Sequence, residues 1–281
     1  MNKLLYPLKL IPIYKKAIWG GNRLGKESGT AEAWLLTVRD DGMNIIDNGV
    51  CKGMTLSEYL NVDESDFSLF VKFIDAGDKL SIQVHPNKTE AWYIVEADEG
   101  AQLVYGLKEN YTEDQIRNAI NNGTLEELLN YVNVKAGEVY FIPTGLVHAI
   151  GGGILIAEIQ QNSNITYRLY DYNRRQADGT LRELHIDDGV KSIKHFDDLK
   201  ADTTECEYFK FDKYEITDTM TISATDCYKH VLCIGGSGKI GGEPIRNHES
   251  YFIPQGLSDV VITADETLSV IVSETRGDAR F

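Results

Sequence analysis

Apolar and polar residues alternate with a period of two along most of this chain. The alternation is clearest at 69–74, 80–84, 139–142, 154–159 and 251–253, and Gly, Asp and Asn residues separate these runs. A period of two places successive side chains on opposite faces of a β-strand. The 15 tyrosines and 9 phenylalanines are also typical of half-buried strands. Short strands at regular spacing predict a mainly β protein built from antiparallel barrels or sandwiches.

Helical signals are fewer and short. Residues 112–119 and 124–129 each begin with a threonine that acidic residues follow. A threonine before the first turn can accept a hydrogen bond from the helix backbone, and acidic side chains there favour the helix dipole. Residues 55–60 form a third candidate. The sequence therefore predicts three short helices.

One seven-residue pattern occurs twice. The sequence YFIPTGL at 140–146 recurs as YFIPQGL at 251–257, and each copy reads as an aromatic strand that ends in a Pro-x-Gly turn. The repeat predicts two copies of one β-domain. The positions that match His148 and Glu158 in the second copy hold Asp259 and Ser269, so the second copy is predicted to be non-catalytic. A polar, acidic stretch at 196–205 marks the predicted boundary.

Charge and cysteine content limit the possible partners. The chain has 28 basic and 43 acidic side chains, a net charge of −15, which disfavours nucleic acid and anionic membranes as partners. The first 21 residues lack the features of a signal peptide, and no apolar run is long enough to span a membrane. The four cysteines show no paired spacing, so we expect reduced thiols and a cytoplasmic location.

Four side chains form a candidate metal site. Gln83 and His85 end the predicted strand 79–84 and project from one face, because strand positions two apart point the same way. After the Pro86-Asn87 turn, Glu90 can return beside the imidazole. His148 arrives from a distant strand, just past the first Pro-x-Gly turn. Two histidines, one carboxylate and one amide oxygen suit zinc or a similar divalent ion.

Each of these residues has an ordinary explanation when taken alone. A single histidine on a strand is more often a core or surface residue than a ligand, and a Gln-x-His pair carries little information. The metal hypothesis therefore depends on the combination. The remaining histidines lack such company and are predicted to be structural or exposed: His185, His195, His230 and His248.

Candidates for acid–base chemistry and phosphate binding lie nearby. Glu158 interrupts the apolar strand 154–159, where burial would raise its pKa towards a range useful for proton transfer. Arg168, on a strand expected to neighbour that of His148, suits a phosphate or a developing enediolate oxygen. Lys88 sits between two proposed ligands, and Ser81 shares the face of His85. Solvated surface positions are the ordinary explanation for all four.

At these segments the chain resembles the type I mannose-6-phosphate isomerases (phosphomannose isomerases) of the cupin superfamily. The matching blocks are LSIQVHP at 80–86, KTEAWY at 88–93, PTGLVHAI at 143–150, and Glu158 with ITYRLYDY at 165–172. Two N-terminal pieces, WGG at 19–21 and AEAW at 31–34, are also similar. The resemblance covers most of residues 5–200. Beyond residue 205 it depends on the barrel pattern.

The resemblance implies a fold, a metal and residue roles. It implies a catalytic, metal-binding cupin domain at 1–200 with a short helical insertion, and a degenerate cupin-like β-domain at 201–281, both jelly-roll barrels. One Zn²⁺ per chain would be bound by residues that match the family's ligands: Gln83, His85, Glu90 and His148. Arg168 matches the catalytic arginine, whereas Glu158, Lys88 and Ser81 match positions implicated in proton transfer or phosphate binding.

Two departures indicate a compact bacterial form of the family. Only five residues separate His85 from Glu90, where most relatives have a longer insertion, and the helical segment at 112–130 is short. The implied reaction converts mannose 6-phosphate to fructose 6-phosphate through a cis-enediol, in a monomer or homodimer. A non-enzymatic sugar-phosphate-binding cupin is the main alternative, and a cupin with redox-active iron is a second one. Glu158 and Arg168 disfavour the first, and a ligand set with only two histidines disfavours the second.

Overall fold

The computed structural model describes residues 4–25, 27–176 and 178–276, and it confirms a mainly β protein. The described residues divide into two compact units. One contains 15–32 and 73–203, and the other contains 4–14, 33–72 and 204–276. Both units are assembled from separate stretches of sequence. The predicted division into domains at 1–200 and 201–281 therefore does not coincide with these units and stays a prediction about function.

The unit containing residues 73–203 is built around two open antiparallel sheets. A five-stranded sheet has the order β10 (Leu129–Asn133), β9 (Gln102–Leu107), β12 (His148–Ile150), β7 (Ile82–Val84) and β14 (Tyr167–Tyr170). A six-stranded sheet has the order β11 (Val139–Ile142), β8 (Glu90–Ala97), β13 (Ile154–Gln161), β6 (Leu69–Ala76), β2 (Ile13–Gly21) and β3 (Thr30–Leu36). These sheets are open in the described residues, so the predicted closed barrel is not confirmed.

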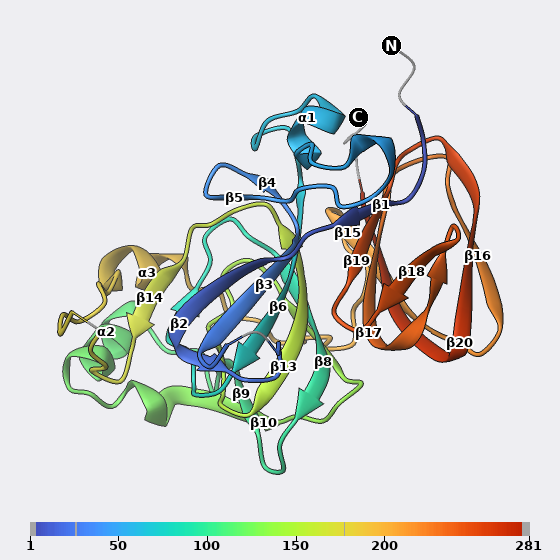
Figure 1. Ribbon diagram of the computed structural model, residues 1–281. Coiled ribbons are helices and arrows are strands. Elements are labelled where there is room, and N and C mark those ends of the chain that lie inside the picture. The colour runs from blue at the N-terminus through green and yellow to red at the C-terminus, as the bar shows by residue number, and fades with distance from the viewer. Residues whose placement is uncertain (1–3, 26, 177, 277–281) are drawn as a thin grey trace. The chain divides into compact units, whose positions relative to one another are not determined.

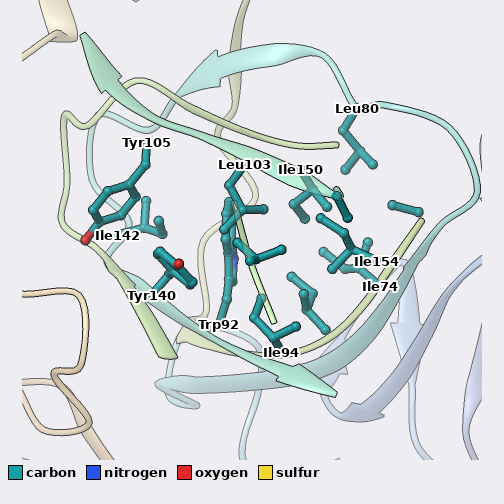
Figure 2. Close-up of a cluster of buried hydrophobic side chains, with 14 of the residues drawn as sticks. Ile74, Leu80, Trp92, Ile94, Leu103, Tyr105, Tyr140, Ile142, Ile150 and Ile154 are labelled. Carbon is teal, nitrogen blue, oxygen red and sulfur yellow. The ribbon is translucent and has the colours of Figure 1, made fainter. Parts of the chain in front are cut away.

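A hydrophobic core fills the space between these two sheets. Trp92 of β8 is almost fully buried at its centre, and Figure 2 shows Leu103, Ile94 and Ile150 pointing towards it. Alternation decides which residues face inward. Leu103 and Ile150 are register partners on the core face, whereas the adjacent pair Val104 and Ala149 points to the other face of the same sheet.

Helices cover that other face of the five-stranded sheet. α2 (Glu113–Asn121) and α3 (Ile186–Ser192) lie beside β14, and their apolar side chains pack in one cluster with Val104 and Ala149 (Figure 1). Two of the predicted helices are confirmed, as α2 and as α1 (Leu56–Leu60), and Thr112 and Thr55 each form a capping box at their starts. The stretch after Thr124 is instead a short 3₁₀ turn, Leu125–Leu128, without a side-chain cap.

The second unit holds most of a seven-stranded antiparallel sheet. Its main path is β1 (Leu8–Leu10), β19 (Ser250–Ile253), β17 (Lys229–Ile240), β20 (Leu257–Thr275) and β15 (Phe209–Ile216), with β16 (Thr219–Ala224) on β20 and β18 (Glu243–Arg246) on β17. A hairpin of β4 (Val38–Arg39) and β5 (Gly42–Met43) and a 3₁₀ turn at Gly49–Cys51 complete the regular elements. All four cysteines are free thiols.

The internal repeat has a structural counterpart in both copies. β11 and β19 each end at the isoleucine before the proline, and the amide of the leucine after the glycine donates to the proline carbonyl, at 3.1 Å for Leu146 and 3.3 Å for Leu257. Gly145 and Gly256 have φ values of 93° and 90°, which L-residues rarely adopt. Tyr140 and Tyr251 each donate their hydroxyl to a carbonyl seven positions upstream. The pattern therefore encodes the same strand and turn twice.

The WGG segment provides a test of the fold. A Cβ atom on Gly20 would lie 2.2 Å from the carbonyl oxygen of Gly29 and 2.9 Å from the amide nitrogen of Ala31, which are backbone atoms that cannot rotate away. We expect Gly20→Ala to lower the free energy of unfolding by about 1–3 kcal/mol through overpacking. Urea denaturation would measure the loss. Gly235→Ala is the control, because its new Cβ would meet only a side-chain atom at 3.8 Å. Equal stability of the two variants would contradict the expected steric conflict.

Candidate metal centre

Three of the predicted site residues form one row across the five-stranded sheet. On β7, which lies between β12 and β14, Gln83 is the register partner of His148 on β12 and of Arg168 on β14. Residues directly opposite in an antiparallel sheet project from the same face. The sequence suggested that the strands of His148 and Arg168 are direct neighbours. That expectation is wrong, because β7 lies between these two strands.

The Pro-x-Gly turn fixes both histidines. The amide of Gly145 donates to the carbonyl of His85 at 2.9 Å, and the carbonyl of Leu146 accepts a hydrogen bond from Nδ1 of His148 at 2.8 Å. His85 is held in a similar way, since its Nδ1 donates to the carbonyl of Ile165 at 3.0 Å. The turn thus joins the end of β7 to the start of β12 and orients the imidazole of His148, whereas Ile165 orients that of His85.

These hydrogen bonds also set the tautomer of each ring. A carbonyl oxygen can only accept, so Nδ1 carries the proton in both His85 and His148, and each Nε2 keeps a lone pair. The two Nε2 atoms face each other 3.2 Å apart. Burial lowers the pKa of both imidazoles, and the Lys88 charge lowers them further, which favours the neutral form.

Glu90 brings a third acceptor to the same point. It opens β8 in the other sheet and is almost fully buried. Its Oε1 lies 3.5 Å from Nε2 of His148, and its Oε2 lies 3.6 Å from Nε2 of His85. One ligand atom from each of the three residues falls within 4.8 Å of the others. Lone pairs that converge so closely repel one another unless a cation lies between them, so these residues fit a metal ion.

Gln83 borders this cluster. Its side-chain amide is 3.2 Å from Nε2 of His148, and rotation of the amide by half a turn would direct Oε1 to the same point. The structure therefore brings together all four predicted ligands. They come from two facing sheets, because Gln83 and His85 belong to β7 and its end, whereas Glu90 begins β8.

Lys88 is buried against Glu90. Its Nζ lies 2.7 Å from Oε2 of Glu90 and donates to Oε1 of Gln160 at 3.2 Å. Burial by itself would raise the pKa of Glu90, but the Lys88 ammonium together with His85 and His148 holds that pKa below its usual range. The lysine therefore stands beside the candidate metal ligands and keeps Glu90 ionised.

Glu158 lies behind the histidines. Its side chain is buried, and Oε2 accepts a hydrogen bond from the indole Nε1 of Trp92 at 2.9 Å. The same indole meets the His148 ring edge-on, with centroids 5.4 Å apart. The prediction that Glu158 is an acid on an apolar, inward-facing strand position is confirmed. Sequence reasoning missed Trp92, although its place two residues after Glu90 on a strand assigns both to one face.

Arg168 and Ser81 lie at the β14 side of the cluster. Nε of Arg168 donates to Oγ of Ser81 at 3.3 Å, and Nη1 donates to the carbonyl of Glu183 at 2.9 Å. Burial, together with the charges of Arg182 and Arg174, lowers the pKa of Arg168. Arginine remains protonated in proteins at neutral pH, so this group stays a cation.

Within the described residues, no helix is long and apolar enough to cross a membrane.

Comparison with known proteins identifies the family. Residues 8–115 match the model of the type I phosphomannose isomerase catalytic domain. Mannose-6-phosphate isomerase ManA of Bacillus subtilis is 34% identical over 90% of this chain and 94% of its own length. A mannose-6-phosphate isomerase of Streptococcus mutans is 35% identical over 83% of this chain and 86% of its own length.

A solved structure agrees with the sequence relatives. The crystal structure of mannose 6-phosphate isomerase from Bacillus subtilis superposes with a TM-score of 0.85 at 30% identity, over 95% of this chain and 99% of that one. The similarity therefore covers nearly the whole of both chains. By these matches, the chain belongs to the type I phosphomannose isomerases, the family of mannose-6-phosphate isomerases.

Proposed function

We propose that this protein is a zinc-dependent isomerase that interconverts mannose 6-phosphate and fructose 6-phosphate through a cis-enediol. The convergence of the His85 and His148 lone pairs with the Glu90 carboxylate is the observation that carries the proposal. These residues and Gln83 would hold one Zn²⁺. A structure with a TM-score of 0.71 and 15% identity is described as a mannose 6-phosphate isomerase bound with zinc and yttrium, which supports that choice of metal.

Each site residue has a proposed part in the reaction. The bound ion would act as a Lewis acid beside the sugar oxygens. Lys88 or Glu158 would carry the proton between C2 and C1, since both are buried next to the ligand cluster. Arg168 would stabilise the negative charge that develops on the enediolate oxygen, and it stands one strand from Gln83. Ser81, fixed by Arg168, would contact the substrate.

The proposal extends to the domains, the oligomeric state and the partners of the protein. The two β-domains would be jelly-roll barrels in the manner of cupins, with catalysis confined to residues 1–200. We propose a cytoplasmic monomer or homodimer whose partner is a small hexose phosphate. Neither nucleic acid nor a membrane surface would bind, because the net charge of −15 repels both.

Removal of the metal tests this function directly. Chelation should reduce isomerase turnover by about 100-fold or more, because Lewis-acid stabilisation contributes several kcal/mol to the barrier. One equivalent of Zn²⁺ should restore it. The assay couples fructose 6-phosphate formation to a dehydrogenase, and metal content is measured on the same samples. Full turnover in a verified metal-free protein would reject the metal role. Tight binding of the sugar phosphate with no turnover in the zinc-loaded protein would favour the sugar-phosphate-binding alternative.

A further inference from the structure

A cluster of arginines lies next to the candidate metal centre in a chain that is otherwise strongly acidic. Arg168 is close enough to Arg174 and Arg182 for their charges to disfavour its own, while the net charge of the chain is −15. Like charges repel, so three guanidinium groups gather at one place only where other contacts hold them there. A local excess of positive charge beside a substrate site is the usual means of attracting an anion.

Asp171 holds two of these arginines in position. It is 5% exposed, and its Oδ1 accepts from Nη2 of Arg174 at 2.6 Å while its Oδ2 accepts from Nε of Arg182 at 2.8 Å. Nη2 of Arg182 adds a further bond to Oδ1. Burial alone would raise the pKa of Asp171, but the hydrogen bonds from Arg182 and Arg174 lower it instead. Nη1 of Arg174 also pairs with Oδ2 of Asp78 at 3.6 Å, so Arg174 is held by two carboxylates, whereas Asp171 is the carboxylate that holds Arg182.

The geometry of Arg182 leaves one edge of its guanidinium available. Nε and Nη2 both bind Asp171, whereas Nη1 makes no hydrogen bond to any residue in the described part of the chain. The side chain is 19% exposed, so solvent or a ligand can reach it. The next residue, Glu183, gives its carbonyl to Nη1 of Arg168, which places the Arg182 backbone against the proposed catalytic arginine. A rigid guanidinium with free N–H groups is well suited to a phosphate.

The metal cluster and the arginine cluster lie on opposite sides of Gln83. Along β7, His85, Gln83 and Ser81 project from one face, with about 6.6 Å between alternate residues. Ser81 binds Arg168, and Arg174 donates to the carbonyl of Lys79, so the arginines lie towards the start of this strand. Lys88 is instead paired with Glu90 at the metal end. In an aldohexose 6-phosphate, the phosphate and the reacting carbons C1 and C2 are at opposite ends of the molecule.

We infer that Arg182, positioned by Asp171, binds the phosphate group of the substrate at the Ser81 end of the site. This inference rests on the proposed function and adds a residue that the family motifs did not indicate. The inference also implies that Lys88 does not bind the phosphate, because its Nζ contacts Glu90 and Gln160 at the metal end. Arg182 and Asp171 therefore act on substrate affinity, and the chemistry stays with the groups around the metal.

Kinetics of the zinc-loaded protein test this assignment. Arg182→Ala should raise KM for mannose 6-phosphate by roughly 10- to 100-fold and change kcat by less than about threefold, since a lost hydrogen bond to a charged group costs that much affinity. The inhibition constant of inorganic phosphate should rise by a similar factor. Arg175→Ala is the control, because that arginine is exposed and its guanidinium donates to the carbonyl of Gly179 within its own loop. A KM and a phosphate inhibition constant unchanged in Arg182→Ala would overturn the inference.

Two further measurements keep the test decisive. Phosphate affinity measured by titration calorimetry needs no turnover, so weaker binding in Arg182→Ala supports the phosphate site even if the isomerase reaction itself is not found. If Arg182→Ala does not fold, Arg182→Gln keeps an amide donor near the position of Nε that can still bond to Asp171, but it lacks the charge and Nη1, and it should lose the same phosphate affinity. Asp171→Asn separates charge from positioning. Removal of a negative charge alone would tighten phosphate binding, whereas the positioning role requires that binding weaken.

Discussion

Replacement of His148 by alanine should abolish both metal binding and isomerase activity. The imidazole is fully buried, its Nδ1 is fixed by the carbonyl of Leu146, and its Nε2 faces both His85 and Glu90. Loss of a partner that merely orients a ligand costs 10- to 100-fold in metal affinity or activity. Loss of the ligand itself should cost more than about 100-fold in each. Metal content by mass spectrometry and turnover in zinc-supplemented buffer are the two readouts.

A matched histidine variant separates this effect from a general loss of stability. His195 is exposed and lies outside the ligand cluster, so His195→Ala should bind one metal ion and turn over normally. Circular dichroism would verify that His148→Ala retains its strands. If folded His148→Ala still bound one equivalent of zinc with the original affinity, the proposed ligand set would be wrong, and the metal would have to lie elsewhere.

Local sequence signals were sufficient where the structure depends on local contacts. The threonine cap at Thr112 and the two Pro-x-Gly turns were predicted because each involves residues a few positions apart. α3 was missed for the converse reason. Its N-cap, His185, makes no side-chain cap, and Gly189 lies in its middle. A Cβ at Gly189 would be 2.6 Å from a side-chain carbon of Leu169, so tertiary packing against β14 requires a residue that disfavours helices.

The site residues were likewise predictable where local spacing decides their position, and not where distant segments pair. The period-two pattern was enough to group Ser81, Gln83 and His85, and the motif order identified all four candidate ligands. The pairing of strands that are far apart in the chain could not be predicted from the sequence, because their register depends on the whole sheet. The sequence therefore placed Arg168 beside His148, whereas the structure sets β7 between them. The hydrogen bonds that Arg182 donates to Asp171 could not be predicted for a related reason. They depend on how the irregular segment after β14 folds back.

Replacement of Arg168 by alanine should lower kcat by about 100- to 1,000-fold and leave the metal in place. The loss corresponds to removal of one preorganised donor from a developing oxyanion. Arg168 is half-buried, and its bonds to Ser81 and to the carbonyl of Glu183 hold the guanidinium still before substrate arrives. None of the metal-facing atoms belongs to it, so zinc content should match that of the unmodified protein. Steady-state kinetics and metal analysis on one preparation measure both quantities.

The pattern of kinetic loss distinguishes Arg168 from its neighbours. Loss of a group that stabilises the developing charge lowers kcat, whereas loss of a group that binds the distant phosphate raises KM. Arg168→Ala should therefore change mainly kcat, and Arg182→Ala mainly KM. Arg168→Lys should recover only part of kcat, because an ammonium cannot keep both hydrogen bonds of the planar guanidinium. Arg117→Ala, a partly buried position on α2 that pairs with Asp187 and lies outside the ligand cluster, is the control and should leave both parameters unchanged. If Arg168→Ala raised KM alone, its charge would serve binding, and stabilisation of the enediolate would fall to the metal and the groups that hold it.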